Sequence, residues 1–212
     1  MKDSKHRIRL RDGRELQFHS PRLGPDSEAV SLLSFIPDPT LKIEVEIGPG
    51  KGEHLWARAR RYPQHFFIGI DRRLDRSRLT QNKLQQLQEK NGVVIREDAR
   101  RFFQTTMPPI HKLHVYQPDP WPKARHHKHR FFRSPDARSW AEALEAHGQL
   151  RVSTDHWEYF LEIVDIVDSW GFMKPTLVAR KCAAMAPPMT HFESIFLKKG
   201  QDVFKAIWTK TK

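Results

Sequence analysis

The sequence has very little cysteine and no long apolar run. Its 212 residues include a single cysteine, Cys182, so an internal disulfide is excluded. This usage suits a reducing compartment. No stretch approaches the roughly 18 consecutive apolar residues of a membrane-spanning helix. The charged segment 1–10 also lacks the apolar region of a signal peptide. We therefore expect a cytoplasmic protein without a membrane partner.

Acidic side chains are scarce relative to basic ones. Lysine and arginine total 37 against 25 acids, which gives a formal net charge of +12. Such an excess favours a polyanionic partner, with nucleic acid as the first candidate. An anionic membrane fits less well, because no segment combines a basic helical face with an exposed apolar one. A basic surface that only keeps the protein soluble stays open as an alternative at this point.

The chain divides into a basic N-terminal segment and a longer unit with a regular pattern. Residues 1–40 predict an arm or a loose hairpin followed by a short helix over 27–35, and residues 41–212 predict one domain. In that domain, strand patterns alternate with helix patterns, which predicts an α/β fold with a mostly parallel sheet and helices on both faces. Strands are expected at 42–47, 66–70, 93–95, 112–117, 149–153, 172–178 and 203–208, and helices at 52–61, 75–90, 134 to near 148, and 156–170.

A glycine-rich turn follows the first predicted strand. Glu46 precedes Gly48, Gly50 and Gly52. Glycines permit a tight turn and close approach of a ligand, and the next helix offers unpaired N–H groups at its start. The G-x-G-x-G spacing favours S-adenosylmethionine over a dinucleotide. Glu46 can pair with the cationic methionine part of that cofactor, although an ordinary strand–helix turn stays open.

Carboxylates follow the next two predicted strands as well. Asp71 comes directly after the second strand, where a carboxylate can accept hydrogen bonds from ribose hydroxyls. Asp98 and Ala99 follow the third strand, within reach of an adenine amino group. Alone, each acid is also typical of a solvated loop or a helix N-cap. Because the carboxyl ends of parallel strands share one edge of the sheet, three acids in register indicate a single binding site.

The most specific stretch follows the fourth predicted strand and reads Q-P-D-P-W-P-K-A-R-H-H-K-H-R over residues 117–130. Prolines hold the backbone around Asp119, and Trp121 offers a face on which a base can stack. Three histidines lie close together, but no cysteine or carboxylate cluster with ligand spacing accompanies them, so no metal site is predicted. The basic residues of this stretch predict contacts with phosphates, namely Lys123, Arg125, Lys128 and Arg130.

Two later positions carry further candidates. Asp155 follows the fifth predicted strand and is either a second carboxylate near the pocket or a helix N-cap. Thr190 and Glu193 lie in the segment T-H-F-E, ahead of Lys198 and Lys199. Glu193 can face the pocket or only pair with those lysines, and local chemistry leaves both roles open.

These residues together resemble the bacterial tRNA (guanine-N7)-methyltransferases. The matching motifs are E-I-G-P-G-K-G, P-D-P-W-P-K-A-R-H-H-K-H-R, T-D-H-W-E-Y and T-H-F-E followed by F-L-K-K-G, in the same order from about residue 40 to the end. The resemblance implies a seven-stranded, Rossmann-like class I methyltransferase fold. It also implies methylation of a guanine in the tRNA variable loop, conventionally position 46.

The resemblance further implies how the residues divide between two ligands. S-adenosylmethionine would be bound by Glu46, Gly48, Gly50, Gly52, Asp71, Asp98, Ala99 and Asp119. The target guanine and its tRNA would lie near Asp119, Lys123, Arg125, Asp155, Thr190 and Glu193. This chain departs from the family at His129, where an arginine is usual, at Asp71, often a glutamate, and in the apolar segment 182–189.

The chemistry of guanine N7 needs no strong base, since its lone pair is already available. We expect catalysis to come mainly from placing N7 about 3 Å from the transferable methyl group. A carboxylate nearby stabilises the positive charge that develops on the purine, and Asp119 is the predicted catalytic residue. Asp119 or Asp155 can accept hydrogen bonds from guanine N1–H and the exocyclic amine.

Two other functions stay open at this point. An exocyclic-amine methyltransferase usually carries two prolines before an aromatic residue, whereas here one proline separates Asp119 from Trp121. A basic RNA-binding module without cofactor is the second alternative, and the intact glycine turn disfavours it. The sequence leaves open whether the protein is a monomer or a homodimer.

Overall fold

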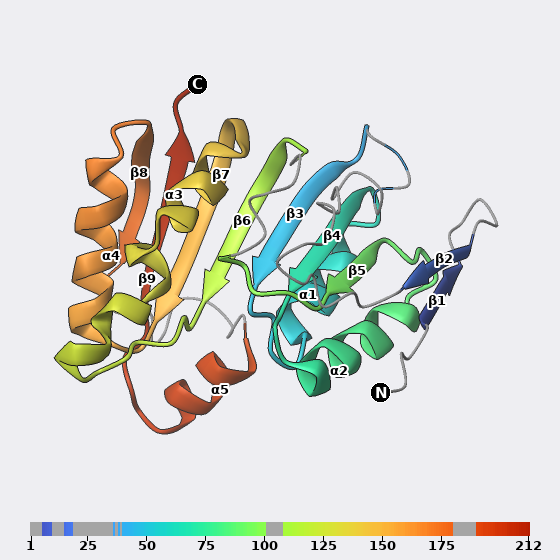
Figure 1. Cartoon of the computed structure of the whole chain (residues 1–212), viewed down its shortest axis with the longest axis horizontal. Coiled ribbons are helices and arrows are strands. Elements are labelled where there is room, and N and C mark those ends of the chain that lie inside the picture. Colours follow the sequence, from blue (N-terminus) through green and yellow to red (C-terminus); the bar gives the residue numbers. More distant parts are fainter. Residues whose placement is uncertain are drawn as a thin grey trace.

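The computed structural model describes residues 6–9, 15–18, 36, 38, 40–100, 108–179 and 190–212. At its centre lies a seven-stranded sheet with the order β5-β4-β3-β6-β7-β9-β8 (Figure 1). Neighbours from β5 to β7 pair in parallel, while β9 runs antiparallel to both β7 and β8. This confirms the predicted α/β fold with a mostly parallel sheet. Its strands are β3 (Lys42–Ile47), β4 (His65–Ile70), β5 (Gly92–Ile95), β6 (Ile110–Tyr116), β7 (Leu144–Thr154), β8 (Met173–Ala179) and β9 (Phe204–Lys210).

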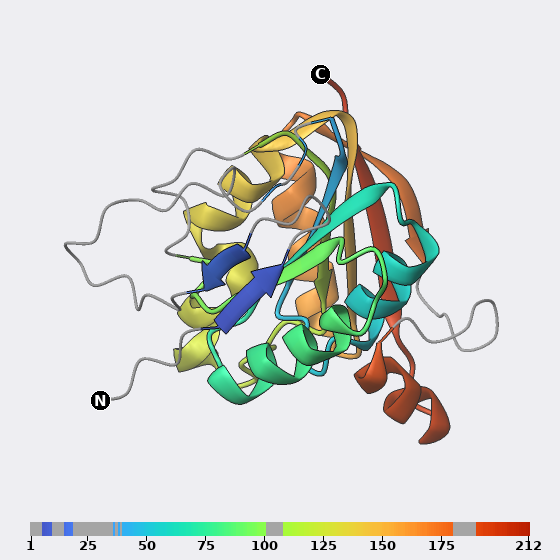
Figure 2. The same ribbon diagram turned by 90° about the vertical axis from the view of Figure 1, so that its right-hand side faces the viewer.

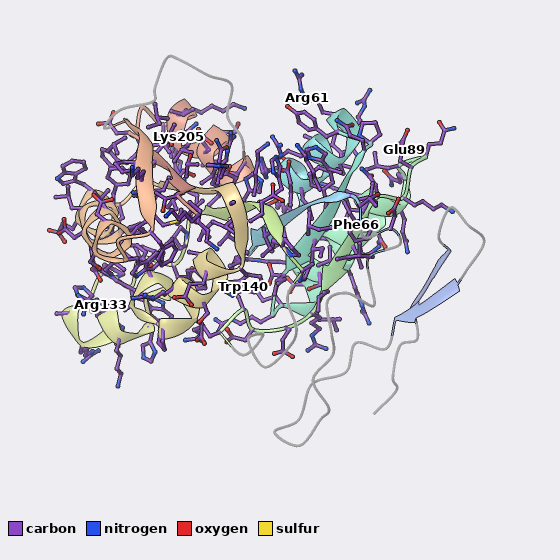
Figure 3. All side chains as sticks on the ribbon, turned by 90° about the horizontal axis from the view of Figure 1, so that it is seen from above. Arg61, Phe66, Glu89, Arg133, Trp140 and Lys205 are labelled. Atoms are coloured by element: carbon purple, nitrogen blue, oxygen red, sulfur yellow. The ribbon has the colours of Figure 1, made fainter. Side chains whose placement is uncertain are left out.

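Helices cover both faces of this sheet, as the alternating pattern predicts. Figure 2 shows α3 and α4 on one side and α1 and α5 on the other. Seen from above, Trp140 of α3 and Lys205 of β9 lie on opposite sides of the sheet (Figure 3). The helices are α1 (Glu53–Arg61), α2 (Leu74–Gln85), α3 (Pro135–Glu142), α4 (Trp157–Ser169) and α5 (His191–Lys198).

The face under α3 and α4 is apolar. Because successive strand residues point to opposite faces, Ile43 and Val45 of β3 share this side of the sheet. Full burial of each large side chain contributes about 1.5–3 kcal/mol. The largest core cluster therefore forms here, and its members include Ile68, Leu113, Val115, Trp140, Leu150, Tyr159, Phe160, Ile163 and Val167.

The opposite face carries a buried charged group at its centre. Glu44 of β3 has no exposed surface. Its carboxylate accepts hydrogen bonds from Arg58 at 2.5 and 2.7 Å, from His65 at 2.9 Å and from His114 at 3.0 Å. The Lys112 ammonium lies 3.6 Å away. Burial by itself would raise the pKa of Glu44, but the hydrogen bonds from His114 and Arg58 outweigh it and hold the pKa well below its ordinary value.

The predicted helix over 134 to near 148 is wrong at its end. Ser134 does cap α3, its hydroxyl accepting the N–H of Asp136, but α3 ends at Glu142. Gly148 lies inside β7, where the register with β6 shifts between Ile110 and Lys112. A Cβ at Gly148 would meet the Ile110 and Glu145 carbonyl oxygens at 2.9 Å. This glycine therefore permits close backbone approach at a bulge and does not stop a helix.

The end of α2, the helix α5 and the N-terminal segment add to or differ from the sequence predictions. Helix α2 ends at Gln85, earlier than the predicted 90, and α5 was not predicted at all. In the N-terminal segment, β1 (His6–Arg9) and β2 (Glu15–Phe18) pair antiparallel in a separate two-stranded sheet. The predicted helix over 27–35, Cys182 and the apolar segment 182–189 lie outside the described residues.

Candidate active site

A cavity of about 330 Å³ opens at the carboxyl ends of β3, β4, β5 and β6. These ends meet at the lower edge of the sheet in Figure 1. Each loop that leaves one of these strands contributes to its lining, as expected for ligands of parallel sheets. Among the predicted site residues, the cavity is lined by Gly48, Asp71, Asp98, Ala99 and Asp119.

Gly48 is the one glycine of this turn that lines the cavity. All three glycines adopt positive φ, with 69° at Gly48, 58° at Gly50 and 71° at Gly52, a region that strains other residues. A Cβ at Gly52 would come within 2.3 Å of the Thr80 side chain. The Thr80 hydroxyl in turn donates to the Gly50 carbonyl at 3.1 Å. Gly50 and Gly52 therefore shape the turn and seat it on α2, whereas Gly48 borders the cavity.

Glu46 lies beneath this turn and is buried. It is 2% exposed, and its Oε2 lies 3.0 Å from His54 Nδ1 on α1. Glu46 is not part of the cavity lining. The structure thus pairs this carboxylate with a histidine of the first helix, and a direct contact with the cofactor stays a prediction.

Asp71 presents a buried oxygen that is not paired by any described residue. The residue is 6% exposed, and its Oδ1 accepts the backbone N–H of Arg73 at 2.9 Å. Within the described part of the chain, its buried Oδ2 has no hydrogen-bond partner. Burial raises the pKa of Asp71, opposed by the Arg73 N–H and the charge of Arg76. A buried acceptor left unpaired costs about 1–3 kcal/mol, which a ligand hydroxyl would recover. The ribose of S-adenosylmethionine fits this requirement.

The loop after β5 is held from two directions. The Asp98 carboxylate accepts hydrogen bonds from the Arg100 guanidinium at 3.1 and 2.7 Å and from its backbone N–H at 3.0 Å. These bonds outweigh burial and hold the pKa of Asp98 below its ordinary value. The Ala99 carbonyl accepts the Trp140 indole N–H at 2.9 Å. Both residues line the cavity on a preformed loop, and the sequence analysis missed Arg100 and Trp140 as their supports.

The loop after β6 carries the exposed Asp119 and the half-buried Trp121. Asp119 and Trp121 line the cavity, together with His129, which the sequence analysis did not single out. The Trp121 ring lies 5.2 Å from the His129 ring and 5.8 Å from the His126 ring, measured between centroids. Trp121 has a φ of 44°, which is uncommon for a residue with a side chain. The loop therefore holds Trp121 in a strained backbone conformation, and its indole lines the same cavity as Asp119.

Arg130 does not fit its predicted role as a phosphate contact. The residue is only 2% exposed. Its guanidinium forms an ion pair with Glu162, donates to the Pro120 carbonyl at 2.8 Å and lies 4.7 Å from the centre of the Tyr159 ring. The prediction for Arg130 is wrong, because these partners bury its charge. Arg130 instead anchors the loop that carries Asp119, while Lys123, Arg125 and Lys128 are exposed.

The last three candidates, Asp155, Thr190 and Glu193, lie outside the cavity lining. The N-cap of α4 is His156, so the N-cap alternative for Asp155 is wrong. Thr190 caps α5 by accepting the backbone N–H of Glu193 at 3.1 Å. Glu193 itself has no exposed surface and forms an ion pair with Lys205 of β9. The contacts of these residues with a substrate stay predictions.

Gln117 is a further residue that the sequence analysis missed. It lines the cavity with a φ of 50°, and its side-chain oxygen accepts the Asp155 N–H at 3.1 Å. Its backbone N–H donates to the Ser153 carbonyl at 2.8 Å. Gln117 therefore ties the Asp119 loop to the Asp155 loop. Gln117 is the last residue of the fourth predicted strand, and this position indicated that it lies at the same edge of the sheet as Asp119.

Among the described residues, no group of three or more histidine, cysteine, aspartate or glutamate side chains is placed to hold a metal ion. Within the same ranges, no helix is long and apolar enough to cross a membrane. The histidines after Trp121 instead contact that indole or, in the case of His127, the Arg130 guanidinium at 3.0 Å.

Comparison with known proteins agrees with this geometry. A family model described as a putative methyltransferase matches residues 41–206. The tRNA (guanine-N(7)-)-methyltransferase of Leifsonia xyli subsp. xyli is 34% identical over 168 residues, which is 76% of this chain and 72% of the relative. The protein of the same name from Nitrosospira multiformis is 30% identical over 78% of this chain and 73% of the relative.

Solved structures add the fold. The 16S rRNA methyltransferase KamB superposes with a TM-score of 0.60 at 16% identity, over 98% of this chain and 100% of that one. The 16S rRNA (adenine(1408)-N(1))-methyltransferase of Catenulisporales acidiphilia, solved with its cosubstrate SAM, gives a TM-score of 0.55 at 14% identity, over 81% and 86%. The fold is thus that of the class I methyltransferases. With the sequence relatives, these observations show that the chain belongs to the tRNA (guanine-N7)-methyltransferase family.

Proposed function

We propose that this protein transfers a methyl group from S-adenosylmethionine to N7 of a guanine in tRNA, at the variable-loop position conventionally numbered 46. The observation that carries the proposal is the single cavity that joins the exposed Asp119 and the half-buried Trp121 to Asp71, whose buried Oδ2 has no partner among the described residues. Membership of the family supports the same activity. A cytoplasmic location follows from a tRNA substrate.

On the cofactor side, the preformed loops bind and orient the ligand. Asp71 accepts hydrogen bonds from the ribose hydroxyls through the oxygen that has no partner in the described chain. Gly48 lets the backbone approach the ligand closely, and the Asp98–Ala99 loop faces the adenine. S-adenosylmethionine supplies the electrophilic methyl group. Glu46 supports the glycine turn from beneath through its hydrogen bond with His54 of α1.

On the acceptor side, the loop after β6 holds the guanine. Its base stacks on Trp121, and the Asp119 carboxylate lies beside the purine, where positive charge develops as N7 is methylated. No proton has to leave N7 before the attack, so this carboxylate acts electrostatically. Asp119 is preferred over Asp155 for reading the N1–H and amine edge, because Asp119 lines the cavity and Asp155 does not.

The test is methyl transfer to unmodified bulk tRNA, followed by mass spectrometry of the nucleosides. We expect 7-methylguanosine as the product. N2-methylguanosine or N6-methyladenosine would instead identify an exocyclic-amine methyltransferase. No transfer, together with no binding of S-adenosylmethionine by calorimetry, would favour a cofactor-free RNA-binding module.

A matched variant sharpens this test. Asp119→Asn keeps the size of the side chain and removes its charge, so tRNA binding should persist while turnover falls. Loss of one charged contact of about 1.5–3 kcal/mol corresponds to a decrease in kcat of roughly ten- to hundred-fold. Normal turnover in Asp119→Asn would remove Asp119 from the proposed mechanism.

A further inference from the structure

One side of the cavity carries four guanidinium groups, and the proposed function uses only that of Arg100, which holds Asp98. Arg72, Arg73 and Arg76 come from the loop after β4 and the start of α2, and Arg100 comes from the loop after β5. We call these four residues the arginine rim. All four line the same cavity as Asp71 and Asp98, although only acids were predicted there.

The members of the arginine rim differ in their partners. Arg73 pairs with Asp75 at 2.8 Å, and both side chains are more than half exposed. Arg100 is engaged by Asp98 at 2.7 Å. Arg72 and Arg76, in contrast, have no hydrogen-bond or ion-pair partner among the described residues, and Arg72 is exposed. Two guanidinium groups at the cavity therefore remain available to an anion.

The cofactor does not account for these charges. S-adenosylmethionine carries a sulfonium and an ammonium group against one carboxylate, so its net charge is positive. Its adenosine part, which the Asp71 side of the cavity suits, carries no negative charge. Extra cations beside that part would not improve cofactor binding by Coulomb attraction. The cofactor therefore leaves the guanidinium groups of Arg72 and Arg76 available to a second, anionic ligand at the same opening.

Across the cavity, the loop after β6 supplies a second cationic margin. Trp121 and His129 line the cavity there, and Lys123, Arg125 and Lys128 are exposed on the same loop. The opening thus has positive charge on both sides. A polyanionic strand lying across it would meet both margins, whereas a strand entering only from the β6 side would leave the arginine rim unused.

We propose that the arginine rim binds phosphates of the RNA strand that crosses the cavity, so that the substrate covers the adenosine end of the bound cofactor. The planar fork of a guanidinium matches two phosphate oxygens, which suits Arg72 and Arg76 for this contact. This inference rests on the proposed function, since it assumes a tRNA substrate. It extends the RNA-binding surface beyond the basic loop to the loops after β4 and β5.

The experiment measures the salt dependence of binding to unmodified tRNA. Neutralising one phosphate contributes about 0.7 to the slope of log K against log salt for a single strand and about 0.9 for a duplex. The Arg72→Ala/Arg76→Ala variant should therefore lose about 1.4–1.8 units of slope if each arginine contacts one phosphate. The Arg72→Lys/Arg76→Lys variant keeps the charge and should recover most of that slope.

The matched control removes the same charge elsewhere. Arg60 and Arg61 are exposed at the end of α1, lie outside the cavity lining and stack near Trp56 and Tyr62. Arg61 lies at the periphery of the molecule (Figure 3). The Arg60→Ala/Arg61→Ala variant should keep the parent slope. Cofactor affinity is measured in parallel by calorimetry near pH 8, because loss of Arg76 raises the pKa of Asp71 further and could otherwise change cofactor binding.

Each outcome decides the proposal. A smaller slope in the rim variant with unchanged cofactor affinity supports it. A slope equal to that of the parent overturns it while leaving the proposed methyl transfer intact. Weaker cofactor binding with an unchanged slope also overturns it and assigns the rim to the cofactor. A parent protein that neither binds nor methylates tRNA overturns the proposed function, and this inference with it.

Discussion

Two neighbouring residues of β3, one on each face of the sheet, reach the same degree of burial by opposite chemistry. Val45 and Glu44 are neighbours on β3, and neither has any exposed surface. Val45 points into the apolar core under α3 and α4, where neighbouring side chains can shift to fill small gaps. Glu44 points the other way and depends on hydrogen bonds from Arg58, His65 and His114. Val45 is therefore stabilised by many weak apolar contacts, whereas Glu44 depends on a few specific hydrogen-bond partners.

Both faces also support the cavity. From the apolar face, Trp140 donates to the carbonyl of Ala99 at 2.9 Å. From the polar face, His114 and the hydroxyl of Tyr116 lie 2.9 Å apart. Ala99 and Tyr116 both line the cavity. Each face therefore supports one residue of the cavity lining, and variants that remove either support measure how much each contributes.

Truncating Glu44 should have the largest effect. Glu44→Ala leaves the charges of Arg58 and Lys112 without their buried partner, and breaking a buried ion pair costs about 3–5 kcal/mol. Val45→Ala removes only apolar groups, which costs about 2 kcal/mol including the cavity. Urea unfolding measures both free energies. Equal losses in the two variants would show that the faces do not differ in this way.

Acid should destabilise the protein through the polar face. Burial lowers the pKa of His114 from 6.5 to about 3, despite its hydrogen bond with Glu44. Between pH 6.5 and about 3, His114 is protonated in the unfolded chain and neutral in the folded chain. The free energy of unfolding therefore falls as the pH falls through this range. The low pKa of Glu44 acts in the same direction below its ordinary value of 4.5.

The variant His114→Gln isolates the first of these contributions. It keeps an N–H donor and removes the titration, so the loss of stability per pH unit should decrease by up to about 1.4 kcal/mol, the value for one proton. Urea titrations at several pH values between 6.5 and 3 measure the slope. An unchanged slope would mean that His114 takes no part in the acid response.

Trp140→Phe should have an intermediate effect on the apolar face. The variant keeps most of the buried area and leaves the Ala99 carbonyl without its indole donor, which costs about 1–3 kcal/mol. Because Ala99 lines the cavity, cofactor affinity should fall as well. Thermal unfolding and calorimetry check the two effects, with Phe160→Leu on α4 as a core control that should spare cofactor binding.

Tyr116→Phe should have the smallest effect on cofactor affinity. It leaves the buried Nδ1 of His114 without its hydroxyl partner, which costs about 1–3 kcal/mol of stability, but it keeps the aromatic ring in the cavity lining. His114 keeps its contact with Glu44, so the remainder of the polar face should stay folded. Calorimetry should show a change in cofactor affinity smaller than that of Trp140→Phe. A larger change would make the polar face the main support of the cavity.

The sequence by itself determined the alternation of strands and helices, except for α5, and the position of the site. Alternating patterns identified the strands, and parallel strands bring their carboxyl ends to one edge, so Asp71, Asp98 and Asp119 were predicted to meet at one cavity. The glycine turn, the loop after β6 and two later motifs together carried the family resemblance. Local signals were sufficient here, because each depends on residues that are close in the sequence.

Only the tertiary structure decided which charges are buried. Arg130 lies in a basic run typical of an exposed loop, but Glu162, 32 residues away, and the ring of Tyr159 bury it. Glu44 is one residue of a short strand pattern, and its partners come from α1, β4 and β6. Gly148 looked like a helix stop and lies in a strand bulge. Such outcomes depend on long-range contacts and on the cost of desolvating a charge, which no local pattern contains.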